Sequence, residues 1–263
     1  MWLRRGARGK SAQMNPPNPH AHLWLFDFDN TLVALEREVD WPGSRRELEA
    51  FLRAEGVDAE IFVDIPKGNL PLYAALHTRW LRAPGIRANI ARPPRAVAEA
   101  LLRRSSTIIE RHELIGAERA QPTPGAIDLL KAIVAHGALI VIVTSNSSRT
   151  VARWLELHRS GDLVRAVVGR DSLLALKPSP EMIVRTLDLA ATPAADTVFV
   201  GDSAADFGAA RAAGLGFYGI ATSELARDRL IAAGATEVFA SPAAMRIHLN
   251  LALPEPAADA ESN

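Results

Sequence analysis

The chain has 263 residues, of which 48% are hydrophobic and 23% charged, enough for one buried core and a smaller appended domain. Thirty basic and thirty acidic residues give a formal net charge of zero, which excludes the strong positive field that recruits nucleic acid or anionic membranes. We therefore expect a small-molecule partner, no nucleic acid and no membrane, with the protein a monomer or homodimer. The lack of cysteine excludes disulfides and thiol catalysis in this chain and fits a cytoplasmic location.

The two ends of the chain differ in composition from the rest. Basic residues near the start are followed by a proline-rich stretch, without the apolar segment of a signal peptide. The last residues are rich in proline, alanine and acidic side chains. We predict a disordered leader over residues 1–20 and a disordered tail over residues 251–263.

Short apolar runs that end in polar residues recur along the chain. Such runs are typical of buried strands, and helical patterns lie between several of them. The alternation of strand and helix predicts an α/β protein with a doubly wound, Rossmann-like parallel sheet. The predicted strands are Leu23–Phe28, Ala138–Val143, Leu163–Val168, Thr197–Val200 and Phe217–Ile220.

Residues 36–119 have a different pattern, with helical spacing of apolar side chains and no convincing buried strand. We interpret this segment as an all-helical cap domain, inserted into a core formed by residues 21–35 and 120–250. An insertion after the first strand lies over the carboxyl ends of the sheet strands, where ligands of such sheets bind, so the cap is placed to act as a lid. Within it, we expect Glu110–Glu113 to form a solvated helical face.

Polar residues cluster directly after the predicted strands. The carboxyl ends of parallel strands converge on one edge of a sheet, so these clusters are expected to meet there. Each cluster alone is a common turn or helix-cap sequence, but four in this order are not. They are Asp27-Phe28-Asp29-Asn30-Thr31, Thr144-Ser145-Asn146, Lys177-Pro178 and Gly201-Asp202-Ser203-Ala204-Ala205-Asp206.

These residue types suit phosphoryl transfer. A phosphate ester resists attack by an anion, so a carboxylate nucleophile such as Asp27 requires a cation and hydrogen-bond donors around the phosphoryl oxygens. Mg²⁺ prefers hard oxygen ligands and retains several waters, so Asp27, Asp202 and the carbonyl of Asp29 could suffice to hold it. The carboxyl group of Asp29, two residues after Asp27, is placed to act as general acid and then base.

The four clusters together resemble the motifs of the haloacid dehalogenase superfamily, in the branch of phosphatases with a helical cap after the first motif. The similarity extends from about Leu23 to Leu249, and phosphoglycolate phosphatases are the group most alike. The resemblance implies a Mg²⁺-dependent hydrolase of a small phosphorylated metabolite. The dehalogenase branch lacks an acid at the position of Asp29, which favours phosphoryl transfer.

The same resemblance implies roles for the remaining polar residues. Asp206 would either complete the metal site or hold a metal-bound water, and Lys177 would neutralise Asp27 and the phosphate. Thr144 through its hydroxyl and Ser145 through its backbone N–H would bind the phosphoryl oxygens. We also expect Asn146, and Lys67 in a cap loop, to bind substrate.

Three alternatives share these residues. A phosphomutase of the beta-phosphoglucomutase type uses the same catalytic set and transfers the phosphoryl group to a second hydroxyl instead of water. A signalling receiver domain also combines aspartates, Mg²⁺, a hydroxyl and a lysine on a doubly wound sheet, but the chain length and the helical insertion disfavour it. The third is an inactive binding protein on this fold.

Overall fold

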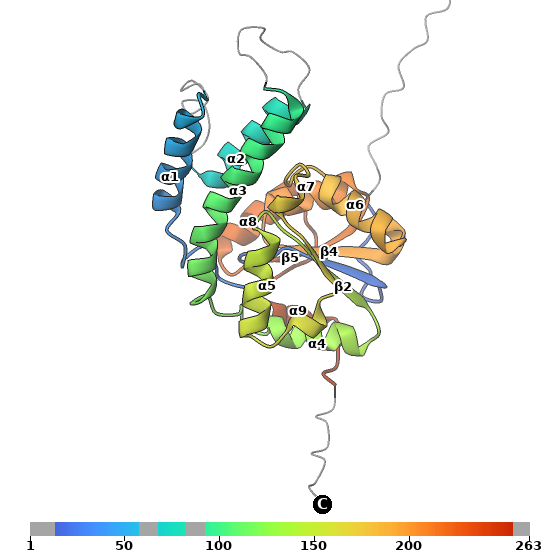
Figure 1. Ribbon diagram of the computed structural model, residues 1–263. Helices are drawn as coiled ribbons and strands as arrows, with labels where there is room; N and C mark the ends of the chain where they lie inside the picture. Colours follow the sequence, from blue (N-terminus) through green and yellow to red (C-terminus); the bar gives the residue numbers. More distant parts are fainter. Residues whose placement is uncertain (1–13, 58–67, 83–92, 255–263) are drawn as a thin grey trace, which may run out of the picture.

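A parallel β-sheet of six strands forms the centre of the protein (Figure 1). The computed structural model describes residues 14–57, 68–82 and 93–254. The strand order is β3-β2-β1-β4-β5-β6, so β1 lies in the middle with β2 on one side and β4 on the other. The strands are β1 (Leu23–Phe26), β2 (Leu139–Val143), β3 (Ala166–Val168), β4 (Thr197–Gly201), β5 (Gly216–Ile220) and β6 (Val238–Phe239).

Helices cover both faces of the sheet. Successive residues of a strand point to opposite faces, and both faces of the central strands carry apolar side chains that must be buried. Leu23 and Leu25 of β1 belong to one buried cluster with residues of α6, α7 and α8, whereas Trp24 and Phe26 belong to a second cluster with α4, α5 and α9. These helices are α4 (Ala126–Ala135), α5 (Ser148–Leu157), α6 (Glu181–Ala190), α7 (Ala204–Ala212), α8 (Glu224–Ala233) and α9 (Pro242–His248). This three-layer arrangement confirms the predicted α/β, doubly wound class.

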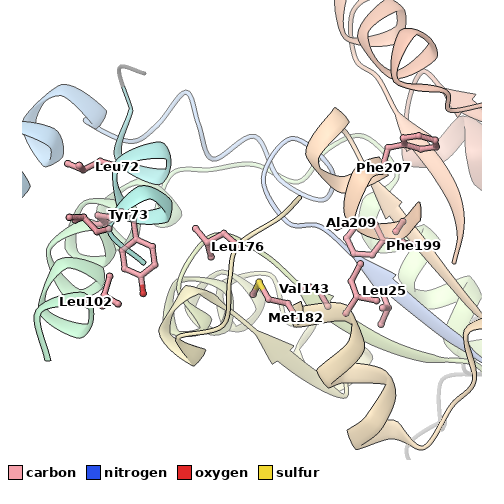
Figure 2. Packing of buried hydrophobic residues seen from close by; sticks show 14 of the residues in the cluster. Leu25, Leu72, Tyr73, Leu102, Val143, Leu176, Met182, Phe199, Phe207 and Ala209 are labelled. Carbon is pink, nitrogen blue, oxygen red and sulfur yellow. The ribbon is translucent and has the colours of Figure 1, made fainter. Parts of the chain in front are cut away.

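Helices also account for the regular structure described between β1 and α4. They are α1 (Trp41–Ala54), α2 (Asn69–His77), a π-helical turn (Thr78–Arg82) and α3 (Arg95–Ala117). Their apolar faces join the same buried cluster as one face of the sheet. In Figure 2, Leu176 lies between Leu72, Tyr73 and Leu102 of the cap helices on one side and Met182 of α6 and Val143 of β2 on the other. The helical layer therefore shares a continuous apolar interior with the α/β core.

Two connecting segments run between the helical layer and the sheet. They lie side by side, because the Ala34 N–H donates to the Gln121 carbonyl and Val33 pairs with Pro122. Arg119 bonds both the side chain and the carbonyl of Glu38 on the opposite segment. These contacts hold the two connecting segments next to each other where the chain enters and leaves the helical layer. The domain boundaries at residues 36 and 119 remain our interpretation.

Some predicted boundaries differ from the structure. β1 ends at Phe26 rather than Phe28, since the Phe28 carbonyl accepts N–H bonds from Leu32 and Val33 and closes a turn. The third predicted run forms a 3₁₀ turn at Gly161–Leu163 and a strand only from Ala166, and β6 was not predicted.

Both predicted disordered ends are wrong in part. Asn15 bonds the Gly214 carbonyl through its backbone and its side chain, and Pro17 packs on Gly216, so residues 14–20 lie against the sheet rather than in a free leader. At the other end, Leu251 is buried and exchanges hydrogen bonds with Arg246. Among the residues that the structure describes, no helix has the length and apolarity needed to cross a membrane.

Candidate active site

The polar residues that follow the central strands line a single cavity of about 700 Å³. Asp27 and Asp29 follow β1, Thr144 follows β2 and Asp202 follows β4, so three adjacent parallel strands deliver them to the same edge of the sheet. Trp41, Leu70 and Ala74 line the cavity from the helical layer. The cavity thus lies between the sheet edge and the cap helices, and its size is that of a small-molecule site.

Lys177 provides the positive charge at the floor of the cavity. Its ammonium group forms ion pairs with Asp27 and with Asp206, and its side chain is only 4% exposed. Burial disfavours the charge, but the two carboxylates prevail and raise the pKa of Lys177 above its ordinary value. Lys177 therefore remains charged at neutral pH.

Three carboxylates surround this single lysine. Asp27, Asp202 and Asp206 each place an oxygen so that all three oxygens lie within 4.8 Å of one another. Burial raises the pKa of Asp27 and of Asp202, and repulsion from neighbouring carboxylates raises both further. One ammonium cannot neutralise three carboxylates, whereas a divalent cation with a preference for hard oxygen ligands can. The donor set therefore fits Mg²⁺.

Asp206 is fixed by local structure at the start of α7. Its second oxygen accepts bonds from the backbone N–H (3.0 Å) and the hydroxyl (2.6 Å) of Ser203, and the Ser203 hydroxyl accepts the Asp206 N–H in return. This reciprocal capping box leaves the other oxygen for Lys177. A Cβ at Gly201 would lie 2.6 Å from the Cβ of Asp206, so only glycine permits this approach.

Asp29 is separate from the three clustered carboxylates. Its Oδ1 accepts the Glu36 N–H at 2.9 Å, and burial raises the pKa of Asp29 to about 7. A pKa near 7 lets this carboxyl group gain or lose a proton near neutral pH, and Asp29 is not one of the three convergent carboxylates. The predicted metal contact through the Asp29 carbonyl stays a prediction.

Side chains of the loop after β2 bond one another and the cap. The Thr144 hydroxyl donates to the Asn146 side chain at 3.0 Å, and the Asn146 amide group donates to Glu113 at 3.0 Å. Thr144 and Asn146 are buried but belong to the lining of the cavity, and their predicted contacts with substrate stay predictions. Ser145 lines the cavity, as expected for a phosphate-binding loop. Lys67 lies outside the described residues.

Glu113 is the residue that sequence reasoning misjudged most. It was assigned to a solvated face, but it is fully buried and pairs with the equally buried Arg170 at 2.8 Å. Glu113 continues the buried stripe of α3 that includes Leu102, Ser106 and Ile109. A charge at that helical spacing was the available signal, whereas nothing in the sequence near Arg170 indicated burial.

A doubly wound parallel sheet, an inserted helical layer and acidic residues at the strand ends define a class of α/β proteins with a site that fits a divalent cation. Residues 22–214 match the family model of the haloacid dehalogenase-like hydrolases. The chain belongs to this family.

Curated relatives and solved structures are similar to the chain. A phosphoglycolate phosphatase of Pseudomonas fluorescens is 36% identical over 92 residues, 35% of this chain and 34% of the relative. Phosphoglycolate phosphatase 1 of Pseudomonas aeruginosa is 28% identical over 156 residues, 49% of this chain and 57% of the relative. The chain thus spans less than two thirds of the length of these relatives.

The solved structures support the fold. A putative phosphoglycolate phosphatase from Lactobacillus delbrueckii has a TM-score of 0.57 at 17% identity, covering 88% of this chain and 98% of that one. CbbY from Rhodobacter sphaeroides, in complex with phosphate, has a TM-score of 0.54 at 22% identity, covering 85% and 95%.

The raised carboxyl pKa values predict that the metal-free protein loses stability as the pH rises from about 5 to about 8. The ordinary pKa of aspartate is 3.8, whereas burial raises the pKa of Asp27 to about 6, of Asp29 to about 7 and of Asp202 to about 9. The folded state binds more protons than the unfolded state in this window, so the free energy of unfolding falls with rising pH. The pKa values of three glutamates are lowered, but they change the free energy of unfolding only below about pH 4.5 and do not oppose this trend. These residues are Glu47, Glu49 and Glu118.

Thermal melts in EDTA and in excess Mg²⁺, each at about pH 5 and at about pH 8, check this expectation. Mg²⁺ should raise Tm more at the higher pH, because the carboxylates must be ionised to bind it. At a Mg²⁺ concentration one hundred times Kd, binding should add about 2.7 kcal/mol to the free energy of unfolding. Asp202→Asn should weaken the effect. A Tm that rises with pH in EDTA would contradict the raised carboxyl pKa values, and a Tm that does not change with Mg²⁺ would contradict the predicted metal site.

Proposed function

We propose that the protein is a Mg²⁺-dependent phosphatase that hydrolyses a small phosphorylated metabolite through a phosphoryl group carried on Asp27. The observation that carries this proposal is the arrangement around Lys177: a nucleophilic carboxylate, two further carboxylates and a separately held acid line one cavity. A bound Mg²⁺, held by Asp27, Asp202 and Asp206, would neutralise charge on the phosphoryl oxygens. Family membership and the phosphoglycolate phosphatase relatives support the reaction class.

The first half-reaction transfers the phosphoryl group to the protein. A carboxylate oxygen of Asp27 attacks phosphorus, the bond to the leaving oxygen breaks, and the protonated Asp29 donates its proton to that oxygen. Lys177 and the backbone N–H of Ser145 stabilise the charge on the phosphoryl oxygens, and the Thr144 hydroxyl can join them only if it gives up its bond to Asn146. A neutral Asp29 is available for this step because burial raises its pKa to about 7.

The second half-reaction returns the enzyme to its starting state. Asp29, now ionised, accepts a proton from water, whose oxygen attacks phosphorus as the bond to Asp27 breaks. Inorganic phosphate leaves, and Asp29 is again protonated. A phosphomutase would differ only in the acceptor, a substrate hydroxyl in place of water.

Asp27→Asn should abolish turnover, by a factor on the order of 10⁴ or more, because an amide cannot act as the nucleophile. Steady-state hydrolysis of p-nitrophenyl phosphate in Mg²⁺ measures this. Asp188→Asn, an exposed aspartate of α6, is the matched control and should retain wild-type rates. Substantial activity in a pure, folded Asp27→Asn sample would refute the covalent mechanism.

Asp29→Asn keeps the acceptor for the Glu36 N–H but removes the proton-transfer group. Because p-nitrophenolate leaves without protonation, this variant should release about one product per enzyme in a burst and then stall at the phosphorylated Asp27. Rapid-mixing absorbance measures the burst, and Asp27→Asn/Asp29→Asn should eliminate it. Linear turnover at the wild-type rate would show that Asp29 takes no part in proton transfer.

The substrate is addressed by phosphate release from a panel of phosphoglycolate, sugar phosphates, nucleotides and pyrophosphate. Phosphoglycolate should give the highest kcat/KM, since the curated relatives bear that name. Isomerisation of a sugar phosphate that depends on a bisphosphate, with little phosphate release, would instead support a phosphomutase.

A further inference from the structure

A buried ion pair connects the cap to the core behind the loop that follows β2. Glu113 of α3 and Arg170, just after β3, have no exposed side-chain surface. Arg170 donates from both terminal nitrogens, at 2.8 Å to Oε1 and 3.0 Å to Oε2 of Glu113. This two-pronged geometry fixes the orientation of both side chains. Neither residue lines the cavity.

Glu113 accepts three further hydrogen bonds, all from residues at or after the end of the Thr144–Asn146 segment. The donors are the Asn146 amide group at 3.0 Å, the Ser147 backbone N–H at 3.1 Å and the Thr150 hydroxyl at 3.2 Å. The Asn146 side chain in turn accepts the Thr144 hydroxyl. The carboxylate of a cap residue thus determines where the loop turns into α5.

Arg170 holds the same loop from the core side. It donates to the Ser145 carbonyl at 2.8 Å, and its own N–H donates to the Asn146 carbonyl at 2.8 Å. On the cap side it bonds the hydroxyl and the carbonyl of Ser106 in α3. The preceding residue, Gly169, approaches so closely that a Cβ would lie 2.5 Å from the Ser148 nitrogen. The loop is therefore clamped between α3 and the end of β3.

A buried ion pair is a poor source of stability, because desolvation of the two charges offsets their attraction. This pair supplies geometry instead: five of its hydrogen bonds end on the loop or on the helix that the loop starts. The loop is also where a transferring phosphoryl group requires fixed donors, since displacement by about 1 Å can cost on the order of 100-fold in rate.

We propose that Glu113 and Arg170 are positioning residues, which hold the Thr144–Ser147 loop in its phosphate-binding conformation and lock α3 to the core. Cap helix α3 then forms part of the scaffold for phosphoryl transfer. The proposal rests on the phosphatase function proposed above. It assigns the cap a role in the chemical step besides substrate recognition.

Glu113→Gln tests the proposal, because it preserves size while removing the charge and one acceptor. We expect kcat for p-nitrophenyl phosphate to fall by about 10- to 100-fold, and the Ki for inorganic phosphate to rise. The Mg²⁺ concentration for half-maximal activity should stay unchanged, because the pair does not contact Asp27, Asp202 or Asp206. An equal weakening of Mg²⁺ binding would indicate general structural damage and overturn the proposal.

Amide hydrogen exchange provides a readout that needs no activity. In Glu113→Gln, the peptide that spans residues 143–150 should exchange at least about tenfold faster than in the wild type, while β1 and β4 stay protected. Faster exchange throughout the core, or no change in the loop, would overturn the proposal.

A matched control lies less than one turn earlier on the same helix. Glu110→Gln removes a carboxylate that pairs with Arg149 of α5 at 3.5 Å, also between cap and core but outside the loop. It should leave kcat and loop exchange at wild-type values. If Glu110→Gln and Glu113→Gln behave alike, loss of any cap–core ion pair explains the effect, and the proposal fails.

Two further variants keep the test decisive if Glu113→Gln does not fold. Arg170→Lys retains the charge but loses the pair of parallel hydrogen bonds to Glu113. Glu113→Gln/Arg170→Met leaves no unpaired buried charge. Each folded variant should show the same loss of kcat and the same local exchange; wild-type kcat in either would refute the proposal. Absence of hydrolysis in the wild type would refute the proposed function instead.

Discussion

The interaction on which the site depends is the shared ion pair of Lys177 with Asp27 and Asp206. These residues come from three separate segments of the chain, and the parallel order of β1 and β4 brings their elements to one sheet edge. A buried carboxylate cluster without this ammonium would take up protons rather than remain charged. Lys177 thus allows three carboxyl groups to lie together in a small volume.

Fold class and the acidic site could be predicted from the sequence, because both follow from local patterns. A buried parallel strand is a continuous apolar run, and its functional residues follow directly at its carboxyl end. Asp27, Thr144 and Asp202 were found in this way. The boundaries at Phe28 and Leu163 were missed, since hydrophobicity alone does not reveal where the backbone leaves the sheet to form a turn.

The unpredicted part of the site depends on partners distant in sequence. Glu113 and Arg170 are 57 residues apart and bury each other, so neither has a local signal strong enough to outweigh the usual exposure of charged residues. The hydrogen bond from Asn146 to Glu113 is unpredictable for the same reason, because Glu113 lies on an element whose docking the sequence does not specify. Burial of charge is a property of the assembled fold.

Asp206 serves two structures at once. One oxygen closes the capping box that starts α7, and the other contacts Lys177 in the site. The electrostatic state of the cavity is therefore connected to the first turn of a core helix. A substitution at Asp206 that is meant to probe the proposed metal site would also remove an acceptor of this capping box, so its effect on the site and its effect on the start of α7 must be separated.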